Sequence, residues 1–224
     1  NRNRALCRTP TKFGVRPCRV RRYGGRVPIS FDITGLQQMD TNTWGDHSTG
    51  DIVTLTYHDV VPDLPAPLED LDTLRTRLAE ISAESGCLVE AFLVWVDKLP
   101  GLLRVEKLPL PNRDRGLVFA ASIVVPKDRC SAVFQILCPE FGTTGLREAA
   151  LMTQLGPQHM FPPHPYAPGL RGKLPYNIAD EVRWDEQFPD HPVSRARRWV
   201  ARTVPTAKVD PGFAALPPFP GPQI

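Results

Sequence analysis

The sequence predicts an α+β protein in which helices sandwich an antiparallel sheet, preceded by a basic arm and followed by an extended, proline-rich tail. Four apolar, strand-like runs follow one another between residues 88 and 137, and the short polar turns between them favour antiparallel neighbours. A leucine stripe at helical spacing precedes these runs. Positive charge is concentrated at the start of the chain and proline towards its end. These shifts in composition predict an arm over 1–26, a domain over 27–156 and a tail over 157–224.

The first part of the predicted domain contains two strands, a loop and a helix. Residues 27–31 alternate in polarity and suit an edge strand, while residues 52–58 alternate as a half-buried strand does. Residues 35–50 are polar and contain glycines, which predicts a loop. Apolar residues at steps of three and four predict a helix over 68–81, with Gly86 at its end. The stripe consists of Leu68, Leu71, Leu74, Leu78 and Ile81.

The second part is a meander closed by a helix. Thr143 or Thr144 is placed to cap that helix, which runs to Leu155 and ends at Gly156-Pro157. The four predicted strands cover residues 88–96, 102–108, 117–125 and 131–137. The run over 88–96 is nearly all apolar, so we expect it to be central in the sheet.

The C-terminal tail is rich in proline and in aromatic side chains. Residues 157–178 hold six prolines and predict an extended segment, residues 180–187 a short helix, and residues 190–204 a longer one. Large rings bury the most surface per residue, so we expect them to anchor the tail on the body or on a partner. The tail aromatics expected to bind a partner are Phe161, Tyr166, Tyr176, Trp184, Phe188 and Trp199.

The N-terminal arm differs in charge from the rest of the chain. Residues 1–26 contain nine arginines and lysines and no acidic residue, so the net charge of +3 divides into +9 for the arm and −6 for the remainder. Such an arm contacts something anionic (nucleic acid, anionic lipid or an acidic protein face) or folds back on its own acidic body. The residues expected to bind an anionic partner are Arg16, Arg19, Arg21 and Arg22.

Cysteine usage points to a reducing compartment, and hydropathy to a protein that does not cross a membrane. The five cysteines include no C-x-x-C pair, and Cys87, Cys130 and Cys138 lie in or beside apolar runs, where cysteine behaves as a small hydrophobe. No apolar run reaches the length of about 20 residues that spans a bilayer. We therefore expect a cytoplasmic protein that does not cross the membrane. The arginine-rich start also resembles the remnant of a transit peptide, which would place the protein in an organelle matrix.

Catalytic signatures are sparse. The G-x-S-x-G motif, a sharp turn that exposes a nucleophilic serine, does not occur. The loop Gly45–Gly50 contains an aspartate, a histidine and a serine in a row, but adjacent side chains in a loop cannot form a catalytic relay. A candidate pocket between sheet and tail would use Asp46, His47 and His58. The histidine spacing matches no metal-ligand pattern, and no phosphate-binding glycine loop is present, so we expect neither a metal nor another cofactor.

The order of elements resembles the Mog1/PsbP-like fold. The resemblance rests on the helix over 68–81, the turn Lys98–Gly101, and the strands on either side of Pro126–Cys130. Segments 144–149 and 188–192 are similar to uncharacterised actinobacterial proteins, which carry no activity with them. Members of the Mog1/PsbP-like group are mostly accessory subunits, adaptors and chaperone-like binders, so the resemblance implies a binding role.

The sequence therefore leads to three functional hypotheses. The leading hypothesis is a non-catalytic accessory or adaptor subunit whose arm and tail bind a partner protein or a second copy of the chain. The first alternative is a small hydrolase or small-molecule binder with the pocket between sheet and tail. The second is a nucleic-acid-associated structural protein that binds through residues 1–26.

Overall fold

A seven-stranded antiparallel sheet forms the centre of the molecule. The computed structural model describes residues 27–111 and 115–222, so the predicted arm with Arg16, Arg19, Arg21 and Arg22 lies outside the described residues. The strands follow the order β2-β3-β4-β8-β7-β6-β5, and every neighbouring pair is antiparallel. They are β2 (Gln37–Asp40), β3 (Thr43–Asp46), β4 (Asp51–His58), β5 (Cys87–Val96), β6 (Leu99–Pro109), β7 (Leu117–Pro126) and β8 (Ser131–Pro139).

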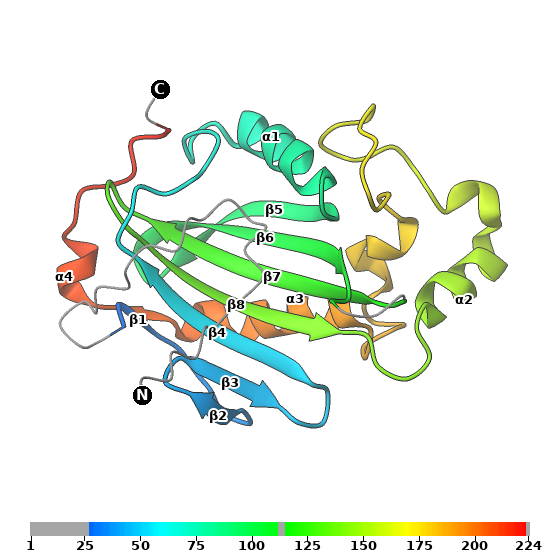
Figure 1. Cartoon of the computed structure of the whole chain (residues 1–224), viewed down its shortest axis with the longest axis horizontal. Coiled ribbons are helices and arrows are strands. Elements are labelled where there is room, and N and C mark those ends of the chain that lie inside the picture. Colours follow the sequence, from blue (N-terminus) through cyan, green and yellow to red (C-terminus); the bar gives the residue numbers. More distant parts are fainter. Residues whose placement is uncertain (1–26, 112–114, 223–224) are drawn as a thin grey trace, which may run out of the picture.

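Helices lie on both faces of this sheet. Figure 1 shows α1 (Leu71–Ala83) beside β5, and α3 (Pro192–Thr203) running behind β7 and β8. Neighbouring residues of β6 divide between two cores: Leu102 packs in the cluster with α1, and Leu103 in the cluster with α3. Successive side chains of a strand point to opposite faces, so the two helices cover opposite sides. The predicted α+β class and the four-stranded meander are confirmed.

The helix α1 begins three residues later than its leucine stripe predicts. The Asp70 side chain accepts a hydrogen bond from Thr73 N and caps the helix, while Leu68 is buried ahead of it. Ile81, predicted in the stripe, is 53% exposed, and Ser82 takes the buried position. Gly86 is required by close packing, because a Cβ there would lie 2.2 Å from the carbonyl oxygen of Lys107 on β6.

Three predictions for the domain are wrong. The predicted loop over 35–50 contains the hairpin β2–β3, whose short polar strands lack the apolar alternation of a typical strand. The predicted strand over 27–31 shrinks to β1 (Ile29–Ser30) and pairs with β9 (Lys208–Val209) in a separate two-stranded sheet. The strand β5 lies at an edge of the sheet, although its apolar sequence predicts a central place.

The second helix, α2 (Leu146–Leu155), starts without a threonine cap. Its N-cap is Gly145, in the left-handed region at φ 73°, and no side chain caps the helix. The Glu140 carboxylate instead accepts a hydrogen bond from Gly145 N. A carboxylate next to the first turn also suits the helix dipole.

The C-terminal segment is part of the hydrophobic core. Val193, Ala196 and Trp199 of α3 lie in the same cluster as Phe134 of β8. A smaller cluster joins α2 to the segment that follows it through Leu151, Met160, Ile178 and Ala179. The helix predicted over 180–187 is replaced by 3-10 turns, and residues 205–222 are less extended than predicted. These shorter elements are η1 (Pro157–His159), η2 (Ile178–Asp180), η3 (Val182–Trp184), η4 (Val204–Thr206) and α4 (Pro211–Ala214).

Replacing Trp199 tests whether the C-terminal segment is needed for folding. Trp199 is 4% exposed in the main core, so Trp199→Ala should lower the free energy of unfolding by roughly 3–5 kcal/mol. Phe161→Ala is the matched control, because Phe161 is 58% exposed in the same segment and should cost less than about 0.5 kcal/mol. Denaturant unfolding of both variants measures the difference. Equal, small effects would show that α3 does not contribute to the core.

Candidate functional sites

The three residues of the predicted pocket do not meet. Asp46 pairs with Asp51 at the first residue of β4, whereas His58 is the last residue of that strand. Seven strand steps separate those positions by roughly 23 Å. Asp46 accepts hydrogen bonds from the side chain and backbone of Ser48, which lower the pKa of its carboxyl. Burial lowers the pKa of His58. Asp46 therefore ends β3 and His47 begins the turn that follows, and no relay with His58 forms.

The tail aromatics mostly face the protein itself. Trp199 is buried beside Phe31 and Phe134, and Tyr176 is partly buried against the same core. Tyr166 packs against the α1 cluster, and Trp184 and Phe188 pack against the small cluster of α2. Phe161 alone of the six is largely exposed, at 58%. Five of these rings therefore attach the segment to the body.

A pocket of about 320 Å³ lies between α1, the start of β5 and residues 161–176. His164 on its wall has both ring nitrogens engaged: Nε2 lies 2.8 Å from the carbonyl oxygen of Leu88, and Nδ1 accepts from Tyr166 N. Burial raises the pKa of the Cys87 thiol to about 11, so this cysteine stays protonated and unreactive at neutral pH. The pocket therefore offers a cavity of mixed polarity without an activated nucleophile or a free histidine.

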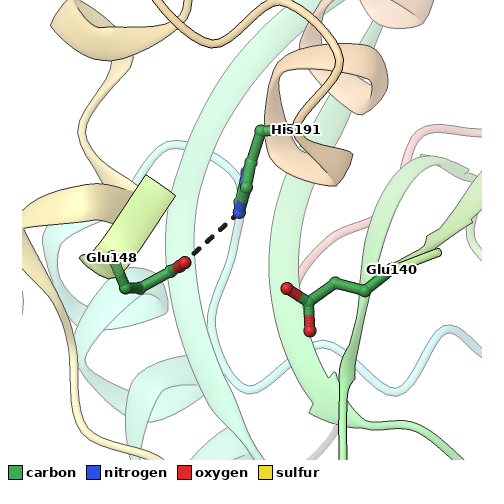
Figure 2. Close-up of side chains that lie close together, drawn as sticks. All are labelled: Glu140, Glu148 and His191. Carbon is green, nitrogen blue, oxygen red and sulfur yellow. Dashed lines mark ion pairs between the residues drawn. The ribbon is translucent and has the colours of Figure 1, made fainter. Parts of the chain in front are cut away.

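A second pocket, of about 520 Å³, is lined by Glu140 and His191, which form a cluster with Glu148. Figure 2 shows Glu148 from α2 and Glu140 from the end of β8 on either side of His191, which precedes α3. His191 Nε2 lies 3.5 Å from Glu148 Oε1, and the histidine side chain is 7% exposed. Neither His191 Nε2 nor Glu148 Oε2 has a hydrogen-bond partner among the described residues. The residue types and distances make this cluster the candidate metal centre of the described chain.

The hydrogen bonds of His191 do not suit a metal. Its Nδ1 accepts a hydrogen bond from Val193 N at 3.3 Å, which caps α3. In the neutral ring the proton then sits on Nε2, and that is the nitrogen that faces the glutamates. A metal on Nε2 would force a proton onto Nδ1 against the N–H of Val193, whereas metal-binding histidines donate their second nitrogen to an acceptor. The cluster fits a polar contact between the Nε2–H of His191 and the Glu148 carboxylate, which connects α2 to the start of α3.

Buried ion pairs connect the C-terminal segment to the sheet. Arg195 forms a bidentate pair with Asp51 of β4: its Nη2 lies 2.8 Å from Oδ1 and its Nε 3.1 Å from Oδ2. Arg197 bonds Asp185 and also Glu90 of β5. The side chains of Arg195 and Arg197 are only 10% and 12% exposed, so these charges lie within the protein and not on its solvated surface.

Two further cations in this network are almost fully buried. Arg147 of α2 is 1% exposed and donates to Asp185 Oδ1 and Ser194 Oγ. Lys107 of β6 pairs with Asp180, and both side chains are at most 5% exposed. Isolated charged residues give no periodic signal in a sequence, so these pairs could not be found there.

The outer edge of β5 divides into a covered half and an open half. At Ala91 the backbone N–H donates to Tyr166 Oη and the carbonyl oxygen accepts from Arg75 Nε. Beyond it the strand is apolar and exposed, with Phe92 at 41%, Leu93 at 42% and Trp95 at 69%. The opposite edge strand, β2, is short and polar and has an irregular register, which protects against edge pairing. The open half of β5 lacks such protection.

Breaking the Lys107–Asp180 pair tests the buried network. Lys107→Met leaves the Asp180 carboxylate buried without its cation and should cost roughly 3–5 kcal/mol in the free energy of unfolding. The double variant Lys107→Met/Asp180→Asn removes both charges while the new side-chain amide keeps an acceptor for Asn177 N, and should recover most of that loss. Denaturant unfolding measures both. A single variant that costs under about 1 kcal/mol would contradict the burial of this pair.

The Glu148–His191 pair predicts a pH dependence of stability. Burial raises the pKa of Glu148, but the contact with His191 outweighs this effect, so the pKa of the Glu148 carboxyl lies below its ordinary value. The folded state then binds fewer protons than the unfolded state. The stabilisation is complete above about pH 4.3, the ordinary glutamate pKa, and is lost as pH falls below it.

The measurement is the difference in unfolding free energy between the wild type and Glu148→Gln from pH 7 to pH 3. The difference should shrink below about pH 4.3. Glu186→Gln, which replaces an exposed glutamate, serves as the control. A difference that grows with acid would reverse the sign and refute the pairing.

Comparison with known proteins gives no family assignment. No protein-family model matches the chain, and no curated protein matches it. Within residues 27–111 and 115–222, none of the helices has the length and apolar character needed to cross a bilayer.

Proposed function

We propose that this chain is a non-catalytic accessory or adaptor subunit that binds another protein chain through the open half of β5. The observation that carries the proposal is the uncharged stretch Phe92–Trp95 at the edge of a large sheet, in which Phe92, Leu93 and Trp95 are exposed. Edge strands bind extended segments by adding a strand, with backbone hydrogen bonds for affinity and side-chain contacts for specificity. The sequence predicted that the arm and tail bind the partner. We assign this binding to the sheet edge instead, because five of the six tail rings pack against the body.

The chemistry of the described clusters supports binding over catalysis. The candidate pair of Asp46 and His58 is separated along β4, and both nitrogens of His164 are engaged. Burial raises the pKa of the buried thiols of Cys87, Cys130 and Cys138, which disfavours the thiolate needed for nucleophilic attack.

The resemblance to the Mog1/PsbP-like group stays a prediction, and it rests on the order of the elements. A hairpin and a third strand lead into a helix, then a four-stranded meander returns to pair beside that third strand, with helices on both faces. By analogy of architecture alone, this adds to the proposal of an accessory role.

A small-molecule binder is the second candidate, and the 320 Å³ pocket favours it. Its walls include Leu170, Arg171 and Tyr176, so it suits a small ligand with both polar and apolar groups, bound between α1 and the C-terminal segment. A ligand that raises the melting temperature, with an effect that Ala83→Trp abolishes by filling the pocket, would identify this function. If no member of a library of small ligands changes the melting temperature, the small-molecule binder is excluded.

The adaptor proposal predicts that Trp95→Lys releases the chain from its assembly. A central tryptophan typically contributes about 2 kcal/mol or more to an interface, which corresponds to roughly thirtyfold in affinity. When the full chain is isolated with its partners, the wild type should have the native mass of an assembly and Trp95→Lys that of a single chain. The melting temperature of the chain should stay unchanged. Phe161→Lys is the matched control, because it alters a similarly exposed ring of the tail.

Other outcomes of this experiment identify the alternatives. Loss of the assembly in Phe161→Lys but not in Trp95→Lys would place the contact on the tail. An assembly that survives both changes, weakens steeply with salt and is lost on deletion of residues 1–26 would identify a nucleic-acid partner.

A further inference from the structure

Resting on the proposed function, we propose that β5 pairs with β5 of a second copy of this chain, antiparallel and with Val94 on the two-fold axis. The two sheets then join into one continuous sheet across the dimer. A two-fold axis perpendicular to the sheet keeps α1 on the same side in both copies. Two-fold dimers with self-complementary surfaces are the commonest protein oligomers.

The register between β5 and β6 determines which backbone groups of β5 point outwards. Trp95 lies opposite Pro100, and Ala91 lies opposite Arg104. Proline has no N–H, and the groups of Ala91 bond to Tyr166 and Arg75 outside the sheet, so both positions are non-hydrogen-bonded pairs towards β6. The pattern alternates, so Leu93 behaves in the same way. The N–H and C=O of Leu93 and Trp95 thus face the open edge and have no partner among the described residues.

Both ends of this open stretch are closed to further pairing. On one side, Tyr166 and Arg75 occupy the groups of Ala91. On the other, the chain turns at Asp97, whose φ of 56° lies in the left-handed region of a tight hairpin turn. Within the open stretch, Leu93 and Trp95 therefore offer their groups, and they are symmetric about Val94.

This symmetry selects one register for a second copy. With Val94 opposite Val94, Leu93 of each chain faces Trp95 of the other, and the two pairs exchange four backbone hydrogen bonds. With Leu93 opposite Leu93, Trp95 would face the occupied groups of Ala91. With Trp95 opposite Trp95, Leu93 would face the turn at Asp97. Only the Val94-centred register gives a hydrogen-bond partner to each N–H and C=O group of Leu93 and Trp95.

Side chains and charge agree with this register. Leu93 and Trp95 lie on the same face of the strand, so each tryptophan ring packs on the leucine of the other copy. The stretch Phe92–Val96 carries no charge that would oppose an identical strand.

Cysteine cross-linking of the purified full chain tests the register. Val94→Cys places two cysteines directly opposite in a non-hydrogen-bonded pair, at a Cα distance of about 4.5 Å, within the range of a disulfide. Phe92→Cys is the matched control: in this register the two copies of residue 92 are four residues apart along the strand, about 13 Å, too far to bridge. Wild-type chain under the same oxidant accounts for the native cysteines.

The expected result is a covalent dimer of Val94→Cys alone, with peptide mapping that assigns the disulfide to position 94. Sedimentation of the unmodified chain should show a concentration-dependent dimer, and Trp95→Lys should weaken it about thirtyfold or more. Equal cross-linking of both cysteine variants, or none by Val94→Cys, overturns the register. A chain that sediments as a monomer at every concentration overturns the second copy as partner.

The same measurements separate this inference from the adaptor proposal. If the purified chain is monomeric but Trp95→Lys still releases it from a native assembly, the edge binds a different chain and only the second-copy inference fails. If Trp95→Lys changes neither the dimer nor the native assembly, both proposals fail.

Discussion

Charge pairing under α3 is the constraint on which the rest of the structure depends. One face of the sheet is apolar and must be covered, and α3 covers it with Val193, Ala196 and Trp199. The same helix carries Arg195 and Arg197, which come to lie where water is largely excluded. Burying such charges is costly unless each is paired and hydrogen-bonded. Carboxylates on β4 and β5 and in the segment before α3 meet this requirement, so the sheet and the C-terminal segment depend on each other.

This constraint also explains where binding surface remains. A segment rich in proline and aromatic rings looks in isolation like a flexible docking tail, but its rings pack in three clusters, and Arg195 and Arg197 are paired inside the molecule. The part of it that reaches β5, through Tyr166, covers one end of that strand and leaves the other end exposed. The same packing that attaches the tail thus defines the length of the open edge.

The histidine cluster shows why residue types alone do not define a site. Glu140, Glu148 and His191 have the spacing of a metal centre, yet the hydrogen bond from Val193 N to Nδ1 leaves the proton on the nitrogen that faces the glutamates. The cluster then acts as a fastening between α2 and α3. A single helix cap decides between the two interpretations, because the two nitrogens of the imidazole ring are coupled through one proton.

The sequence by itself determined the α+β class, the meander and the two main helices, because periods of two and of three to four residues report directly which face of an element is buried. It could not determine the hairpin over 37–46, whose strands are polar, or the place of β5, since an apolar run reads alike at a sheet centre and at an exposed edge. The separation of Asp46 from His58, the pairing of Arg195 with Asp51 and the open groups of Leu93 and Trp95 were decided by tertiary structure alone. Each depends on which strands are neighbours and in which register, and contacts between residues distant in sequence carry no local signal.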